Sequence, residues 1–405
     1  KSIAFVMRTP AEDCWKIDMP SPPEGAKWTA EPRVIEGVYF RQDRRGFMKD
    51  GYLHLFTVDA GGGTAKQLTS GRWNVGARTI GLDYGIGIDW TPDSKSIVFD
   101  GLMEDDDPEM PYRRSHLYAV NVATREIRRL TFHEGPWTGP VVSPDGKRVA
   151  FTGFRWTGQT YRVDELYVIG IDGSDQRSLT PKFDRSPELL HWTADGSGLY
   201  FTAEDRGTTN VHFASLKGKV RQLTEGNHML DLESVAKSGL AVGVLRAPHE
   251  PGDIVRFELP SGNGLTRLTA VNEDLFGDLR LGEVEEIWYD STDDTRVQGW
   301  IVKPPNFDPE KTWPLILYIH GGPHGMYNVG FRFYFQHLAA AGYLVLYTNP
   351  RGSIGYGTDF GNAIDNSYPS VDYHDLMAGV DAIIERDWVD TTRMYITGVS
   401  GGGVL

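Results

Sequence analysis

One short pattern returns along the first two thirds of the chain and restricts the fold more than any other feature. The pair Leu-Thr occurs at 68–69, 130–131, 179–180, 223–224 and 268–269. A second pattern alternates with it, a tight turn that leads into an apolar strand, as in WTPDSKSIVF (90–99), VSPDGKRVAF (142–151) and WTADGSGLYF (192–201). Strand-only repeats of roughly 45 to 60 residues are typical of the four-stranded blades of a β-propeller.

Each repeat has a readable internal order. Pro-Asp-Gly sets a tight turn, and the apolar run after it predicts a half-buried strand. A further strand follows, as in HLYAVNVAT (116–124) and ELYVIGIDG (165–173). A β-sandwich with coincidental turns is the alternative, and the five occurrences of the Leu-Thr pair favour the propeller. Residues 1–6 match the strand after the turn, so we expect the chain to begin inside a blade. The Pro-rich segment 8–35 then predicts an ordered loop between blade strands.

The pattern changes after the last Leu-Thr pair, and we place a domain boundary at 278/279. A hairpin is predicted over 285–305. Apolar strands then alternate with helical segments, which is typical of a parallel, doubly wound sheet. The predicted buried strands lie in the segments 313–323, where the strand runs into glycines, 343–352 and 393–402, and the helices are 333–343 and 373–384. The fold class is therefore an N-terminal all-β propeller (1–278) plus an incomplete C-terminal α/β-hydrolase domain (279–405).

Composition excludes several classes of partner. The 41 basic and 55 acidic residues give a net charge of −14 without a basic stripe, which argues against nucleic acid. The strongest apolar run, 314–319, is too short to span a membrane. Cys14 is the single cysteine, so an internal disulfide or a cysteine zinc cluster is excluded. We expect no metal and no cofactor.

The sequence GVSGG (398–402) is a G-x-S-x-G motif directly after an apolar strand. A nucleophile elbow needs this context, because small residues must flank the sharp turn that exposes the serine. We therefore predict Ser400 as a nucleophile. The alternative is a Gly-rich surface loop.

A second Gly-rich turn, HGGP (320–323), follows an earlier predicted strand. We predict that the N–H groups of Gly322 and Gly401 form an oxyanion hole. A phosphate-binding loop is disfavoured because the Lys-Ser/Thr pair is missing. His320 and His324 are four residues apart but lack the acidic partner of a zinc motif, so we expect them to order the loop.

The loop NPRGSIGYG (349–357) follows the next predicted strand and should border a ligand crevice. His320, Arg351 and Tyr356 are the candidates for lining that crevice, with a scaffold ion pair favoured for Arg351. The acidic run 104–107 is a candidate for cation or amine binding, but a solvated loop is the favoured interpretation.

Four motifs in this order, HGGPHGMY, TNPRGSIGYG, DYHDLMAGVDAII and GVSGGG, resemble the prolyl oligopeptidase family of serine peptidases, and its acylaminoacyl-peptidase-like branch in particular. The resemblance implies a propeller, seven-bladed in the family, that restricts access to short peptides. It also implies Ser400 as nucleophile and Gly322 and Gly401 as oxyanion donors. Prolyl oligopeptidases and dipeptidyl peptidases have a tyrosine at the position of His320, which favours the acylaminoacyl branch. The glutamate motif that binds a free substrate amine in dipeptidyl peptidases is missing.

The α/β-hydrolase order of a triad is Ser, then Asp, then His. We therefore expect both partners of Ser400 beyond residue 405, and expect this stretch to be an inactive piece of a longer enzyme. Replacement of the base by His337 or His374 is disfavoured, because both should lie on outer helices.

Three functions stay open: a serine peptidase acting on short peptides with acylated or free N-termini, a non-catalytic propeller binding module, and an esterase using the same serine. The sequence leaves the compartment, cytosol or periplasm, and any homo-oligomer undecided.

Overall fold

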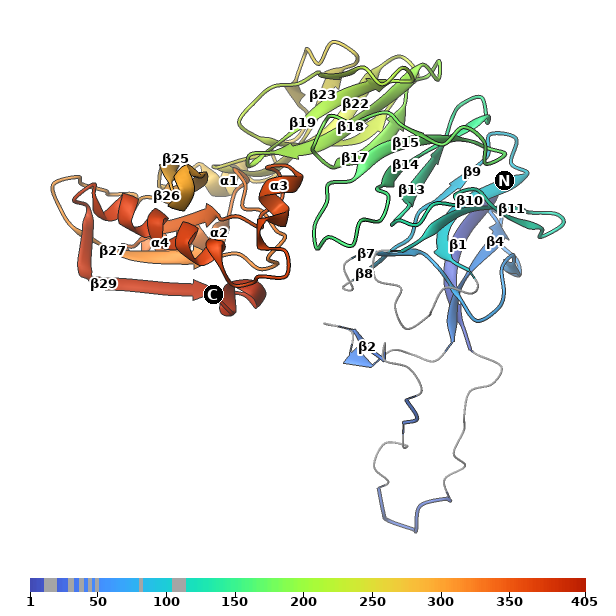
Figure 1. Cartoon of the computed structure of the whole chain (residues 1–405), viewed down its shortest axis with the longest axis horizontal. Helices are drawn as coiled ribbons and strands as arrows, with labels where there is room; N and C mark the ends of the chain where they lie inside the picture. The colour runs from blue at the N-terminus through green and yellow to red at the C-terminus, as the bar shows by residue number, and fades with distance from the viewer. Residues whose placement is uncertain are drawn as a thin grey trace. The chain divides into compact units, whose positions relative to one another are not determined.

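The computed structural model describes residues 1–10, 20–27, 33–35, 40–42, 46–47, 51–79, 83–103 and 114–405 (Figure 1). Half of the predicted Pro-rich loop lies outside these residues, as do Cys14 and the acidic run 104–107.

The first part of the chain forms small antiparallel sheets in sequence order, one for each repeat. The first has the order β1-β4-β5, the second β12-β11-β10-β6 with β9 beside β10, and the third β13-β14-β15-β16. Their bounds are β1 (Ser2–Thr9), β4 (Tyr52–Asp59), β5 (Lys66–Gln67), β6 (Asn74–Val75), β9 (Ile88–Trp90), β10 (Ser96–Leu102), β11 (His116–Asn121), β12 (Ile127–Arg129), β13 (Thr138–Val142), β14 (Arg148–Gly153), β15 (Glu165–Gly170) and β16 (Arg177–Ser178).

Two further four-stranded groups follow and are joined into one sheet by a parallel contact between Thr209 and Met229. They comprise β17 (Pro187–Trp192), β18 (Gly198–Asp205), β19 (Thr208–Ser215), β20 (Val220–Gln222), β21 (Met229–Val235), β22 (Leu240–Ala247), β23 (Glu250–Glu258) and β24 (Thr266–Arg267). Two short pairs, β2 (Arg41–Gln42) with β3 (Gly46–Phe47) and β7 (Ala77–Thr79) with β8 (Asp83–Gly85), lie outside this series.

The Leu-Thr repeat has a structural reason. In each case the threonine hydroxyl accepts the backbone N–H of an apolar residue on the neighbouring strand, at 2.8–3.0 Å. The donor–acceptor pairs are Leu55–Thr69, Leu117–Thr131, Leu166–Thr180, Val211–Thr224 and Ile254–Thr269. The hydroxyl thus satisfies a backbone donor where the last short strand ends, and every repeat needs it.

The predicted turns also repeat one hydrogen-bonding pattern. In the third sheet the Ser143 hydroxyl donates to Asp145 at 2.6 Å, and the same carboxylate accepts the Lys147 N–H at 3.0 Å. These bonds lower the pKa of Asp145 and, in the matching turn of β17–β18, that of Asp195 to about 2. The turn therefore selects Ser or Thr two residues before Asp.

The last part of the chain is a five-stranded sheet of order β25-β26-β28-β27-β29. The predicted hairpin is confirmed as β25 (Val284–Asp290) and β26 (Arg296–Val302), and β28 (Leu344–Asn349) and β29 (Val389–Gly398) run parallel to β27 (Trp313–Ile319) between them. The helical elements are α1 (Glu273–Phe276), η1 (Thr292–Asp294), α2 (Phe333–Ala340), α3 (Thr358–Gly361), η2 (Asn362–Ile364), α4 (Val371–Ile384) and η3 (Ser400–Gly403).

Alternate residues of β28 pack on opposite faces of this sheet. Leu344 and Leu346 share a buried cluster with Leu376 of α4, whereas Val345 and Tyr347 pack with Phe335 of α2. This period of two gives a helix–sheet–helix arrangement.

One expectation about burial is wrong. The segment 393–402 contains the predicted strand, but Tyr395 is 51% exposed and Ile396 is 63% exposed. The reason is that β29 lies at the edge of the sheet, where it pairs with β27 alone.

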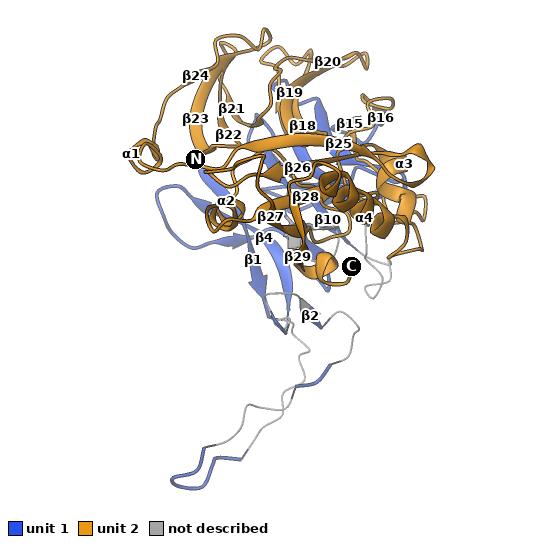
Figure 2. Ribbon diagram, turned by 90° about the vertical axis from the view of Figure 1, so that its left-hand side faces the viewer, with its two compact units in different colours: residues 1–156, 167–177 blue, residues 157–166, 178–405 orange. Residues whose placement is uncertain are grey.

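The chain divides into two compact units (Figure 2), residues 1–156 with 167–177 and residues 157–166 with 178–405. Unit 1 has a core around Trp137 and Phe151 and another around Trp73 and Phe99. Unit 2 contains the sheets from β17 onward, the α/β sheet included. None of the helices in the described part of the chain combines the length and apolar character needed to cross a bilayer.

Candidate active site

Ser400 stands at a sharp turn after β29. Its φ is +57°, a left-handed value that is rare for a residue with a side chain, and its side chain is exposed. A Cβ on Gly398 would lie 2.2 Å from the carbonyl oxygen of Gly402, and a Cβ on Gly402 would lie 2.3 Å from that of Ile319. The spacing of glycines around the serine therefore has a steric cause, which is that of a nucleophile elbow.

The HGGP loop lies directly against this turn. A Cβ on Gly321 would lie 3.2 Å from Cβ of Ser400, and a Cβ on Gly401 would lie 3.1 Å from N, C and O of Gly322. The backbones of Gly322 and Gly401 thus adjoin each other beside the serine.

His320 is part of the same loop, and both of its ring nitrogens have partners. Nδ1 lies 2.8 Å from the carbonyl oxygen of Gly321, and Nε2 lies 3.1 Å from the hydroxyl of Ser353. That hydroxyl also lies 2.6 Å from the carbonyl oxygen of Pro350, to which it donates. Burial, together with the nearby Arg332 guanidinium, lowers the pKa of His320, so the ring is neutral.

Arg351 is only 6% exposed and forms ion pairs inside the protein. Its guanidinium binds the fully buried Asp375 of α4 at 2.7 Å and Asp293 at 2.8 Å. Its backbone N–H also donates to Asp375 at 2.8 Å. The two carboxylates raise the pKa of Arg351, and the side chain holds the loop 350–354 against α4.

The hydroxyl of Tyr356 is used within the protein as well. It donates to Gln298 at 2.5 Å and accepts from the amide of Asn349 at 2.8 Å. Asn349 in turn bonds both the N–H and the carbonyl of Tyr327, at 2.7 and 2.9 Å. Burial raises the pKa of Tyr356, so the phenol stays neutral.

The structure adds two residues that sequence reasoning did not single out. The Tyr368 hydroxyl donates to the carbonyl of Gly401 at 2.8 Å, and Ser353 is fully buried beneath His320. Tyr368 is 33 residues from its partner, and no motif marks it. Only the folded topology brings it to the turn.

Histidines elsewhere in the sheet domain have other contacts. His324 lies 2.9 Å from the carbonyl of Gly352 and stacks on Tyr161, whereas His337 lies on α2 and His374 on α4. No hydrogen bond joins a histidine to the Ser400 hydroxyl within the described residues. The same part of the chain contains no group of three His, Cys, Asp or Glu side chains arranged to hold a metal ion.

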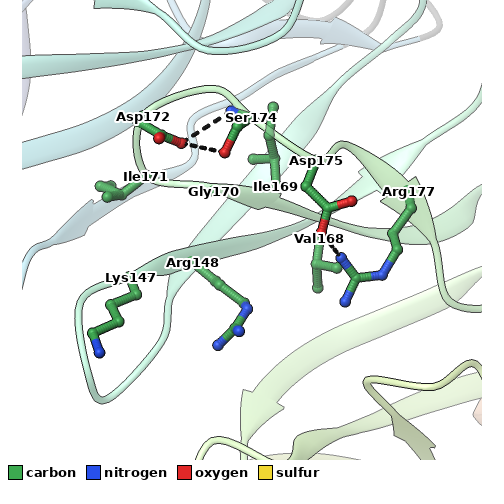
Figure 3. A pocket seen from close by; sticks show the side chains of 10 residues that line it. All are labelled: Lys147, Arg148, Val168, Ile169, Gly170, Ile171, Asp172, Ser174, Asp175 and Arg177. Carbon is green, nitrogen blue, oxygen red and sulfur yellow. Dashed lines mark hydrogen bonds and ion pairs between the residues drawn. The ribbon is translucent and has the colours of Figure 1, made fainter.

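A separate hollow of about 360 Å³ lies wholly in unit 1 (Figure 3). Asp172 and Asp175 in its lining are hydrogen-bonded or paired to Ser174 and Arg177 beside them. None of the residues that line it belongs to the turn at Ser400 or to the loops 320–324 and 349–357.

Two family models match the chain. The prolyl oligopeptidase family matches residues 329–405, and the N-terminal region of dipeptidyl peptidase IV matches residues 39–154. The first includes Ser400 and the second covers repeats of the N-terminal part. The predicted fold class, a propeller followed by the start of an α/β-hydrolase domain, is confirmed.

The relatives and the solved structures that match the chain agree with the two family models. An uncharacterized peptidase of Bacillus subtilis is 30% identical over 93% of this chain, and dipeptidyl-peptidase 5 of Porphyromonas gingivalis is 28% identical over 78%. The fold of Pyrococcus horikoshii acylaminoacyl peptidase superposes over 99% of the chain with a TM-score of 0.79 at 22% identity. The chain spans 57%, 46% and 58% of these three proteins' lengths, respectively.

Proposed function

Because this chain belongs to the prolyl oligopeptidase family of serine peptidases, we propose that it forms part of a peptidase in which Ser400 is the nucleophile. One observation carries the proposal. Ser400 occupies an exposed turn at φ +57°, with the backbones of Gly322 and Gly401 adjoining each other beside it. We assign the N–H groups of these two glycines to the oxyanion hole.

The chemistry is acyl transfer. The Ser400 oxygen attacks the carbonyl carbon of a substrate while a base takes its proton, and the carbonyl oxygen becomes an anion that the two N–H groups stabilise. Collapse expels the amine, which receives the proton from the base, and water releases the acyl group in the reverse sequence. The histidine base and its aspartate come, in this proposal, from residues beyond 405. The 405-residue stretch alone is then inactive, because no described histidine bonds the serine.

The proposed substrates are short peptides, with release of N-terminal acylated or free amino acids. The names of the relatives support both kinds of N-terminus, since one is a dipeptidyl peptidase and one structural neighbour an acylaminoacyl peptidase. The propeller region is proposed to exclude large folded proteins. His320, Arg351 and Tyr356 were predicted to line the crevice, and we now propose that all three act by supporting loops, because their polar atoms bind other protein groups.

The test uses the longer protein that contains these residues, with a fluorophosphonate probe and a panel of acylated amino-acid anilides, free-amine dipeptide anilides and short-chain esters. We expect labelling and anilide hydrolysis that Ser400→Ala abolishes. Labelling that survives in S400A, or no labelling of the wild type, would defeat the assignment and favour a non-catalytic binding module. Hydrolysis of esters with no anilide hydrolysis would favour an esterase.

A further inference from the structure

The peptide group between Gly321 and Gly322 has a hydrogen-bonded carbonyl and an N–H with a proposed role. Its carbonyl oxygen lies 2.8 Å from Nδ1 of His320, and its N–H is the one assigned above to the oxyanion hole. The peptide group is planar, so a bond that fixes the direction of the carbonyl also fixes the direction of the N–H. We propose that His320, held by Ser353, is a positioning residue that aims the Gly322 N–H at the oxyanion. This inference rests on the proposed function.

The hydrogen-bonding rules assign the tautomer of the ring. A carbonyl oxygen can only accept, so Nδ1 of His320 must carry the proton. In the neutral ring Nε2 is then an acceptor, and it faces the hydroxyl of Ser353 at 3.1 Å. The single hydroxyl proton of Ser353 therefore has two acceptors within reach, Nε2 and the nearer carbonyl of Pro350 at 2.6 Å. The opposite tautomer would set two lone pairs against each other at Gly321.

Both ring nitrogens are therefore occupied, and His320 has no spare donor for the substrate. This distinguishes it from a residue that donates directly to the oxyanion. Its effect passes through the backbone of Gly321, where an added Cβ would lie 3.2 Å from Cβ of Ser400. The group that the ring orients is thus next to the reacting serine.

The support beneath the ring is fixed at several points. Ser353 is fully buried in the loop 350–354, and the N–H of Ile354 donates at 3.1 Å to the carbonyl of Gly325, two residues after HGGP. On the other side Arg351 ties the same loop to the buried Asp375. The ring of His320 consequently rests on a frame that extends to α4.

The test compares side chains that keep one of the two ring contacts. An Asn amide at 320 reaches the position of Nδ1 and can donate to Gly321, whereas a Gln amide reaches toward Ser353 instead. In the full-length protein we expect His320→Leu and His320→Gln to lower kcat about 10- to 100-fold with KM changed less than about 3-fold. We expect His320→Asn to stay within about 5-fold of wild type, and Ser353→Ala to lie between.

His337→Leu is the matched control, because it makes the same change at an exposed position of α2. Melting temperatures of all variants check the fold, and if H320L does not fold, the comparison of H320N with H320Q carries the test. Equal kcat values for these two variants, or an unchanged kcat in H320L, would overturn the proposal. The S400A variant separates a failure of the proposed function from a failure of the role proposed for His320. If S400A keeps full activity, the proposed function fails, whereas an inactive S400A with a fully active H320L removes only the role of His320.

Discussion

The blades and the α/β sheet hold their polar groups in different ways. In each blade the threonine hydroxyl accepts a backbone N–H from 13 to 15 residues away, and the arrangement is repeated five times. Around Ser400 the supporting hydrogen bonds are not repeated, and their partners lie further apart in the sequence. The separation is 33 residues for His320 and Ser353 and also for Tyr368 and Gly401. A substitution in a blade should therefore lower only the stability of the protein, whereas a substitution in the sheet domain should also affect the candidate active site.

The largest effect is expected at the buried ion pair of the sheet domain. Asp375→Ala leaves the Arg351 guanidinium buried without its main partner, and we expect a loss of about 3–5 kcal/mol in the free energy of unfolding. Urea unfolding of the full-length protein measures it. We also expect slower fluorophosphonate labelling of Ser400, because the loop below His320 loses its anchor.

Asp375→Asn is the comparison, since it keeps the shape and one accepting oxygen, removes the charge and turns the other oxygen into a donor, and we expect an intermediate loss. A D375A protein that labels at the wild-type rate would break the proposed link between this ion pair and the site.

The second prediction concerns a blade. The fully buried Thr131 hydroxyl lies 3.0 Å from the N–H of Leu117 and 3.2 Å from Nδ1 of His116. Thr131→Val keeps the shape but leaves the buried N–H of Leu117 without this acceptor, so we expect a loss of about 1–3 kcal/mol in the free energy of unfolding, measured in urea. Thr266→Val, at an exposed position, should change the free energy of unfolding by less than about 0.5 kcal/mol. The labelling rate of Ser400 in the folded T131V protein should not change, and a slower rate would contradict the contrast drawn above.

This contrast explains what could be read from the sequence. The Leu-Thr pairs and the Pro-Asp-Gly turns are local and repeated, so both blade strands and their order were predictable. The sharp turn at Ser400 was predictable because the glycines that it needs stand within GVSGG, and the role of Ser400 as nucleophile stays a proposal. The contacts of Ser353, Tyr368 and Asp375 depend on which loops the sheet topology brings together, and no local pattern encodes that. The burial of β29 was misjudged for the same reason, since its apolar residues say nothing of its place at an edge.

A pH dependence is expected from the blade histidine His116. Its Nε2 lies 2.6 Å from the Arg129 guanidinium, which can only donate, so the ring must be neutral with its proton on Nδ1. Burial, then the charge of Arg129, lowers its pKa to about 4. The unfolded state binds a proton near pH 6.5 and the folded state only near pH 4, so stability is full above 6.5 and falls as the pH is lowered to 4.

We expect His116 to account for about 2 kcal/mol of this loss. Urea unfolding at pH 7 and pH 4.5 measures it, with His116→Asn as the comparison, because Asn210 occupies the matching place in a later blade. A pH slope that is the same in H116N as in the wild type would show that His116 does not titrate as described.

The smallest effect is expected at an ion pair that is as short as that of Arg351 and Asp375. Arg267 and Glu250 of the last blade are 2.6 Å apart, against 2.7 Å for Arg351 and Asp375, but their side chains are 43% and 41% exposed. Water already solvates both charges, so Glu250→Gln should cost less than about 0.5 kcal/mol in urea unfolding. Distance is nearly equal in the two pairs, and burial differs. A loss above about 1.5 kcal/mol in E250Q would mean that burial is not what separates the support of the site from the support of the blades.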